Sequence, residues 1–223
     1  MLGREDYLAA WSRWHGGADT ERPVVRGWLS LAYVLARPLA GLPPILATAL
    51  GLGVAAAAVV PSAAGGPWLM AAGILVGLSG LLDSLDGALA IGTGRASRRG
   101  FVLDSAVDRL TEAAYAAALW TAGAPGWLAA AFGALCWLPD YLRARAGQAG
   151  VLRTGAISLW ERPTRVLMTG FTLGGAGVVA AAGLAVQVVT AGAAAGVLLG
   201  AVAVTQLGVR LRRQLAGEGL PPH

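Results

Sequence analysis

The sequence has few charged residues, a single cysteine and no lysine. Charged side chains make up 13% of the 223 residues and hydrophobic ones 56%, whereas a soluble domain usually has about twice that charged fraction. The shortage of charge excludes an ordinary soluble domain and predicts a membrane protein. The one cysteine, Cys136, excludes a disulfide within a single chain. All 17 basic residues are arginine.

Three long stretches contain no charged side chain: residues 38–82, 113–139 and 166–209. A membrane-spanning helix needs about 20 residues, so the first and third stretches can each hold two spans joined by a turn. The middle stretch holds two spans if their ends carry the flanking charges. Each charge-free stretch is interrupted by a segment that is rich in Gly and also contains Pro or Ala. These segments predict turns at 61–67, 121–126 and 183–195.

These features predict an all-α integral membrane protein with six transmembrane helices in three hairpins. The expected spans are 44–61, 67–88, 103–121, 126–146, 163–182 and 187–209. All charged residues then lie at one membrane face, and their arginine excess predicts that this face and both termini are cytoplasmic. The expected location is the cell inner (plasma) membrane.

Two N-terminal segments are predicted to lie at the membrane interface. Tyr7, Trp11 and Trp14 recur at helical spacing beside charged residues, which is typical of an interfacial amphipathic helix. Residues 27–36 are apolar, but as a helix they cover only about 15 Å, half the hydrocarbon thickness. They are therefore interpreted as interfacial too. If they span instead, the number of spans becomes seven.

Four aspartates stand where charge is costly in a membrane protein. Asp83 and Asp86 end one expected helix, and Asp104 and Asp108 begin the next. Spacings of three and four residues place each pair on one helical face. Four gathered carboxylates repel one another, and one or two divalent cations remove that conflict. Oxygen ligands favour Mg²⁺ or Mn²⁺ over zinc. The alternative is that the acids are interface residues or partners of arginines such as Arg109.

The loop between the two pairs, residues 92–100, is small, flexible and basic. Gly87, directly after Asp86, allows a ligand to approach the backbone closely. Arginines and glycines beside a metal suit a phosphate or pyrophosphate ligand. By itself, the loop is more typical of a positively charged cytoplasmic turn than of a phosphate site.

Residues 83–108 resemble the signature of the CDP-alcohol phosphotransferases, D-x2-D-G-x2-A-R-x8-G-x3-D-x3-D. Seven of its eight fixed positions agree over 26 residues: Asp83, Asp86, Gly87, Ala90, Gly100, Asp104 and Asp108. The departure is Ile91, which stands where the family has an arginine that helps hold the CDP part of the donor. Arg95 could replace that arginine if the helix continues so far.

The resemblance implies a phosphatidyltransferase that moves a phosphatidyl-type group from CDP-diacylglycerol or a similar CDP-lipid to an alcohol and releases CMP. It implies one or two Mg²⁺ or Mn²⁺ ions on Asp83, Asp86, Asp104 and Asp108, with Asp108 as catalytic base. The residues that the resemblance implies for binding the CDP-lipid donor are Gly87, Ala90, Ser97 and Gly100. The active site is expected at the cytoplasmic face.

Two further blocks resemble the phosphatidylinositol-phosphate synthase and phosphatidylglycerophosphate synthase branches: residues 141–146 and 161–165. In the former branch, basic residues at the positions of Arg143 and Arg165 bind the acceptor's phosphate. The acceptor is therefore expected to be a phosphorylated polyol, inositol phosphate or glycerol phosphate, with a lipid acceptor left open. The resemblance also implies a homodimer in the lipid bilayer, and no nucleic-acid partner is expected.

The expected organisation has N-terminal interfacial helices at 1–42, a six-helix transmembrane catalytic domain at 43–209 and a basic cytoplasmic tail at 210–223. The sequence leaves two other functions open. Ile91 motivates a non-catalytic CDP-lipid-binding relative that acts as a membrane scaffold or regulator, although all four aspartates are retained. A small transporter with intramembrane acids as an ion path fits less well, since the acids gather at one face.

Overall fold

The computed structural model describes residues 1–14, 19–151 and 160–215, and this part of the chain is entirely helical outside its turns. Two helices precede the long apolar ones: α1 (Arg4–Trp14) and α2 (Pro23–Ala36), followed by the 3-10 turn η1 (Arg37–Leu39). The remaining elements are α3 (Pro44–Ala57), α4 (Val59–Ala64), α5 (Trp68–Gly92), α6 (Arg98–Thr121), α7 (Gly126–Gln148), α8 (Arg162–Val178), η2 (Ala180–Ala182) and α9 (Ala185–Leu215).

The all-α prediction is confirmed, and a helix lies at each of the six segments expected to span. The first of these segments is divided at Ala58 into α3 and α4. The turns fall where Gly was expected to interrupt the helices, at Gly65–Gly66, Gly123 and Gly183, all with positive φ. The tail is only partly described: α9 continues to Leu215, and residues 216–223 lie outside the described residues. The expected domain boundaries stay a prediction.

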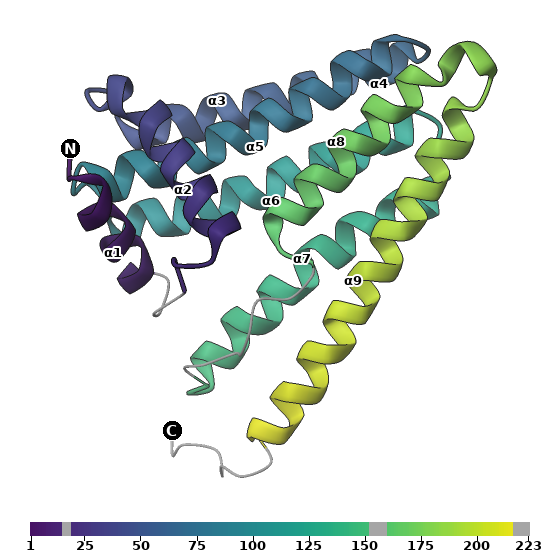
Figure 1. Cartoon of the computed structure of the whole chain (residues 1–223). Helices are drawn as coiled ribbons and strands as arrows, with labels where there is room; N and C mark the ends of the chain where they lie inside the picture. Colours follow the sequence, from purple (N-terminus) through teal and green to yellow (C-terminus); the bar gives the residue numbers. More distant parts are fainter. Residues whose placement is uncertain (15–18, 152–159, 216–223) are drawn as a thin grey trace. The chain divides into compact units, whose positions relative to one another are not determined.

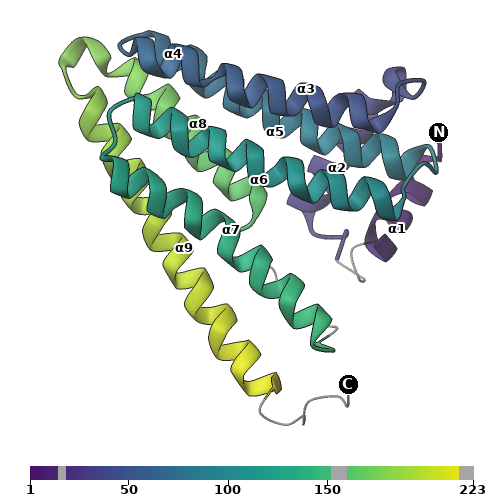
Figure 2. The same cartoon turned by 180° about the vertical axis from the view of Figure 1, so that it is seen from behind.

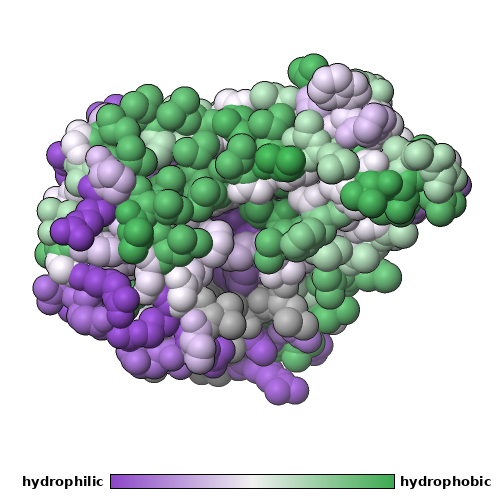
Figure 3. Space-filling view, turned by 45° about the horizontal axis from the view of Figure 1, so that its top comes forward, coloured by the Kyte–Doolittle hydropathy of each residue, from purple (hydrophilic) through white to green (hydrophobic). Residues whose placement is uncertain are grey.

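In the part of the chain that the structure describes, three helical segments are long and apolar enough to cross a membrane: Pro44–Ala64, Trp68–Gly92 and Ala185–Leu215. Large apolar side chains are exposed along them, among them Leu50, Ile74 and Leu198. Figure 3 shows broad hydrophobic areas of this kind on one face of the protein. By contrast, α2 has 14 residues and a length of about 21 Å, which is too short to span and agrees with the interfacial interpretation.

Contacts divide the described chain into two compact units, and α5 and α6 contribute to both. In the first unit, made from Met1–Ala55 and Leu78–Thr111, the N-terminal helices pack on the end of α5. Leu2 N donates to Gly92 O at 2.7 Å, and Tyr33 Oη donates to Leu2 O at 2.8 Å. Figures 1 and 2 both show α1 beside this end of α5.

An apolar core fixes α1 in place. Tyr7 and Leu8 are buried in one cluster with residues of α2 and α5, and burial raises the pKa of Tyr7 to about 12. At the helix surface, Arg26 donates to both carboxylate oxygens of Glu5 at 2.9 Å. This contact lowers the pKa of the exposed Glu5 carboxyl. Residues 1–14 therefore form a docked part of the first unit.

In the second unit, α9 packs against both α7 and α8, as Figure 2 shows for α7. Small residues allow these close approaches. A Cβ at Gly196 of α9 would lie 2.5 Å from the ring of Phe132 on α7. Phe132 in turn meets Trp160 edge-on, with ring centroids 5.6 Å apart. Aromatic side chains thus fill the space that the α9 glycine leaves.

Gly73→Ala is expected to lower the free energy of unfolding by about 1–3 kcal/mol through overpacking. Gly73 lies where α5 crosses α8, and a Cβ there would lie 2.6 Å from both Gly170 O and Gly174 N. Because both atoms belong to backbone, only separation of the helices relieves the clash. Unfolding of the purified protein in mixed detergent micelles measures the loss.

Gly77→Ala is the matched control, one helical turn away on α5, where a Cβ would meet nothing within 4 Å. This variant is expected to keep or slightly raise the stability, because alanine favours the helix. Equal losses in both variants would show that the α5–α8 crossing is not as close as the structure has it.

Candidate active site

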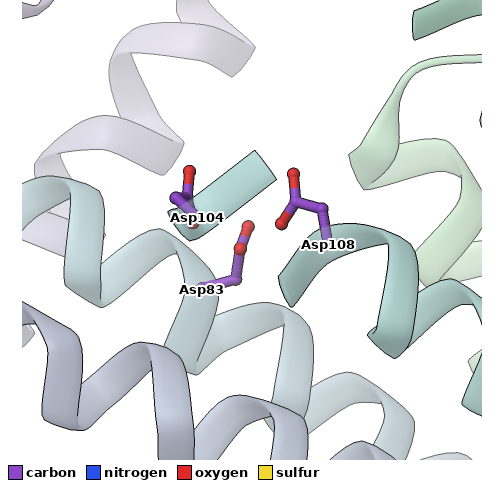
Figure 4. Close-up of side chains that lie close together, drawn as sticks. All are labelled: Asp83, Asp104 and Asp108. Carbon is purple, nitrogen blue, oxygen red and sulfur yellow. The ribbon is translucent and has the colours of Figure 1, made fainter. Parts of the chain in front are cut away.

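Three of the four predicted aspartates come together. One carboxylate oxygen from each of Asp83, Asp104 and Asp108 lies within 4.8 Å of the others, and the side chains point toward one another in Figure 4. The C-terminal half of α5, which continues past its expected end to Gly92, supplies Asp83. The first turns of α6 supply Asp104 and Asp108 on one helical face. We call these residues the aspartate triad.

The triad suits a hard divalent cation. In an octahedral Mg²⁺ site with oxygens at 2.0–2.1 Å, neighbouring ligands are about 2.9 Å apart and opposite ligands about 4.2 Å. Three oxygens within 4.8 Å of one another can therefore reach one ion by side-chain adjustment. All three donors are carboxylate oxygens, which favour Mg²⁺ or Mn²⁺. Like charges held this close in partly buried positions repel one another. Arg109, named in the alternative interpretation of these acids, lies with Nη2 3.9 Å from Asp108 Oδ2 and offsets part of this charge, and a bound cation would offset more of it.

Asp86, the fourth predicted aspartate, is 6% exposed and lies outside the triad. It lines a cavity of about 220 Å³ together with Asp104. The four residues expected to bind the CDP-lipid all line this same cavity: Gly87, Ala90, Ser97 and Gly100. We call it the donor cavity. A Cβ at Gly87 would meet no protein atom within 4 Å, which leaves the space beside Asp86 open.

Local sequence explains the shape of this cavity. Helix α5 ends at Gly92, and Gly94 takes a positive φ of 69°, which glycine adopts without strain. Helix α6 begins after Ser97, whose Oγ accepts a hydrogen bond from Gly100 N at 3.0 Å. Ser97 is thus the N-cap of α6. The cap fixes the start of the helix that carries Asp104 and Asp108.

Helix α5 does not continue as far as Arg95, because it ends three residues earlier, at Gly92. Arg95 therefore does not replace the family's arginine from a further turn of this helix. Arg95 nevertheless lines the donor cavity. The turn places it there: its N–H donates to Ala90 O at 2.8 Å, and Nη1 donates to Leu42 O at 3.0 Å. A turn, rather than a further helical turn, therefore brings an arginine to the cavity.

Ile91, the departure from the family signature, is 8% exposed and belongs to the apolar cluster that contains Tyr7 and Leu8. Ile91 also lines the donor cavity, so an arginine here would lie between the apolar side chains of the N-terminal helices and the cavity. The larger, charged side chain would disturb the apolar contacts of α1. The packing of α1 gives a physical reason for isoleucine at this position, and this reason does not require loss of catalysis.

The predicted acceptor residues lie in the second unit and take part in ion pairs. Arg143 on α7 donates to Asp140 at 3.0 Å and to Glu161 at 2.7 Å. Arg165 on α8 is 1% exposed, and its Nη1 donates to Glu112 and, at 2.9 Å, to Asp140. Its Nε donates to Trp160 O at 3.1 Å. Asp140 therefore joins the two arginines.

The sequence prediction did not identify Glu112 and Asp140 as part of a site. Glu112 is fully buried and pairs with the buried Arg165. A signal was present in the spacing: Asp140 precedes Arg143 by three residues, and acids and bases at this spacing pair on a helix. Glu112 ends the charged part of α6, and its partner on another helix could not be read from the sequence.

Comparisons with known proteins agree with the site. The family model "CDP-alcohol phosphatidyltransferase" matches residues 40–215. The archaetidylinositol phosphate synthase of Aeropyrum pernix is 39% identical over 116 residues, 50% of this chain and 57% of the relative. The enzyme of that name from Pyrococcus horikoshii is 37% identical over 98 residues, 44% of this chain and 52% of the relative. The matched region thus spans just over half of each relative.

Solved structures extend the likeness over more of the chain. Phosphatidylinositol phosphate synthase of Mycobacterium tuberculosis with CDP-DAG bound has a TM-score of 0.65 and 26% identity, covering 82% of this chain and 94% of that one. The same enzyme with manganese and citrate has a TM-score of 0.67 and 25% identity, covering 81% and 88%. The protein is a multi-pass membrane protein, and it belongs to the CDP-alcohol phosphatidyltransferase family.

Proposed function

We propose that this protein transfers a phosphatidyl-type group from a CDP-linked lipid to the hydroxyl of inositol phosphate and releases CMP. The donor cavity carries the proposal, because Asp86 and Asp104 line it together with all four predicted donor-binding residues. The names of the matched synthases favour inositol phosphate over glycerol phosphate as acceptor. The CDP-DAG held by the mycobacterial enzyme supports the donor class.

The chain's own residues account for the chemical step. The acceptor's hydroxyl oxygen attacks the lipid-side phosphorus of the donor, and the bond from that phosphorus to the CMP oxygen breaks. Asp108 takes the hydroxyl proton as general base. The small residues of the donor cavity leave room for the diphosphate, and the remaining aspartates would hold the cation that binds it. Orienting the diphosphate for in-line attack is the main task of an enzyme in phosphoryl-type transfer.

One or two Mg²⁺ or Mn²⁺ ions are the proposed cofactor, held by Asp83, Asp104 and Asp108 with Asp86 as a further ligand. When bound, such a cation neutralises charge on the diphosphate and on the leaving CMP. The manganese in the mycobacterial structure supports this choice. Arg95, at the same cavity, supplies positive charge from the protein itself.

Arg143 and Arg165 are proposed to bind the acceptor's phosphate. Arg143 is the more accessible of the two, with 24% of its side chain exposed, so we assign it the direct contact. Binding by Arg165 would require its contacts with Glu112 and Asp140 to open, because Nη1 donates to both carboxylates. While these contacts are intact, Arg165 positions Asp140, which in turn contacts Arg143.

The proposed topology has six spans, with both termini and the active site at the cytoplasmic face of the inner membrane. Helix α9 has 31 residues and a length of about 46 Å, so it exceeds the hydrocarbon thickness. Its excess carries Arg210, Arg212 and Arg213, which are typical of anchors to lipid headgroups on the cytoplasmic side. A homodimer is the assembly that the family resemblance implies.

Purified protein with Mn²⁺, a CDP-lipid and a panel of alcohols tests the function. The panel contains inositol phosphate, glycerol phosphate, free inositol and phosphatidylglycerol, and mass spectrometry identifies the lipid product while CMP is measured separately. The expected product is a phosphatidylinositol phosphate-type lipid, formed in equal amount to CMP. Binding of the CDP-lipid without CMP release under any condition would instead favour the non-catalytic alternative.

A further inference from the structure

Trp14, the last residue of α1, is part of the donor cavity. It lines the cavity together with Asp86, Arg95 and Asp104. A second cavity of about 320 Å³ is lined by Ala10, Arg13, Trp14, Ile91 and Ala96. Because Trp14, Ile91 and Ala96 line both, the two cavities adjoin at Trp14. The indole is 47% exposed, so a large part of its surface is available to a ligand.

Contacts just before α1 and in its middle set the position of the helix that carries Trp14. The start of the helix is tied to the end of α5 by the hydrogen bond from Leu2 N to Gly92 O. Its middle is buried through Tyr7 and Leu8, and Tyr7 stacks obliquely on Tyr33 of α2 at 5.4 Å between centroids. The aromatic side chain is therefore presented by a docked helix.

The lining of the donor cavity suits a flat aromatic ring. Gly87, Ala90 and Ala96 leave the cavity open with little side-chain bulk, and Ile91 adds an apolar surface. The lining also carries charged groups, at Asp86, Arg95 and Asp104. A nucleotide has the same division into an apolar ring and a charged diphosphate. Aromatic side chains commonly stack on nucleobases in this way.

We propose that Trp14 stacks on the pyrimidine ring of the donor's cytidine, so that the N-terminal helix α1 completes the donor cavity. This inference rests on the proposed function, which supplies the CDP-lipid. The residue lies outside the part of the chain that the family model matches, which begins at residue 40. Trp14 thus adds a nucleotide contact beside Ile91, the position where the family's arginine is missing.

The full-length Trp14→Ala protein in detergent, titrated with CDP in the presence of Mn²⁺, tests the proposal by calorimetry. Loss of base stacking is expected to weaken CDP binding about tenfold or more. Binding of pyrophosphate with Mn²⁺ is expected to stay unchanged, since pyrophosphate has no ring. Trp14→Phe is expected to retain most of the CDP affinity. With CDP-lipid as substrate, Trp14→Ala should raise KM and leave kcat near the wild-type value.

Trp127→Ala is the matched control, because Trp127 is also exposed and stands at the start of α7, in the other unit. It is expected to bind CDP as the wild type does. Unchanged CDP affinity in Trp14→Ala would overturn the inference and leave Trp14 as a lipid-facing anchor. Equal weakening of CDP and pyrophosphate would also overturn it, since the tryptophan would then only support the fold.

Failure of the proposed function and failure of the Trp14 contact give different results in this experiment. A wild-type protein that binds no CDP contradicts the proposed function and the inference together. A wild-type protein that binds CDP and releases CMP from the CDP-lipid, with a Trp14→Ala variant that behaves identically, contradicts the inference alone.

Discussion

Asp108→Asn is expected to leave a folded protein whose CMP release from a CDP-lipid falls by about 10²–10⁴-fold, the range that a general base contributes. Asparagine keeps the size of the side chain but cannot accept the acceptor's proton. Asp108 also belongs to the triad, and the amide oxygen remains as a weaker ligand. Single-turnover measurement of CMP separates this chemical step from product release.

Two measurements distinguish a base from a ligand in this variant. Mn²⁺ titration reports the ligand role, and Asp83→Asn provides the comparison, because Asp83 belongs to the same triad but has no proposed proton transfer. Loss of Mn²⁺ affinity in both variants, with the larger rate loss in Asp108→Asn, is the expected pattern. Asp19→Asn, an exposed change, serves as control. Full activity of Asp108→Asn would remove Asp108 from the base role.

Arg165→Met is expected to lower the free energy of unfolding by about 3–5 kcal/mol, because it leaves buried carboxylates without their guanidinium partner. Arg165 is 1% exposed and Glu112 is fully buried, so water cannot replace the lost contact. Asp140, the second partner, is 30% exposed and is affected less. Equilibrium unfolding in mixed micelles measures the change.

The double variant Arg165→Met/Glu112→Leu is expected to recover much of this stability, since replacing a buried ion pair by apolar residues is often neutral or favourable. Arg4→Met is the control for an exposed pair, with half or more of each side chain accessible, and should change stability by about 1 kcal/mol or less. A small loss in Arg165→Met, close to that of Arg4→Met, would show that Arg165 is accessible in solution and free to take a phosphate ligand.

The helices could be predicted because apolar length and charge placement determine them. Charge-free stretches long enough for spans, broken by Gly and Pro, locate the ends of α3 to α9 to within about six residues. The approach of Asp83 to Asp104 and Asp108 could also be predicted. Each pair of acids lies on one face of its helix, and the two helices are neighbours in the sequence, so the carboxylates can meet in few ways. For both the helices and the triad, the prediction needed only the periodicity within one helix and the closeness of the next helix in the sequence.

The contacts between distant segments could not be predicted in this way. Nothing in residues 1–14 indicates that Tyr7 and Leu8 pack beside Ile91, yet this packing explains why isoleucine is accommodated there. The pair of Glu112 with Arg165 joins positions 53 residues apart, and hydrophobic periodicity carries no information on such a pair. Arg95 reaches the donor cavity through a turn at Gly94, which was expected only as a flexible loop.

An anomalous difference map from crystals grown with Mn²⁺ tests the central claim most directly. The account predicts a manganese peak in direct contact with carboxylate oxygens of Asp83, Asp104 and Asp108, lost in crystals of Asp104→Asn. An enzyme that releases CMP while its manganese lies away from these three carboxylates, or while no manganese is bound, would contradict the account.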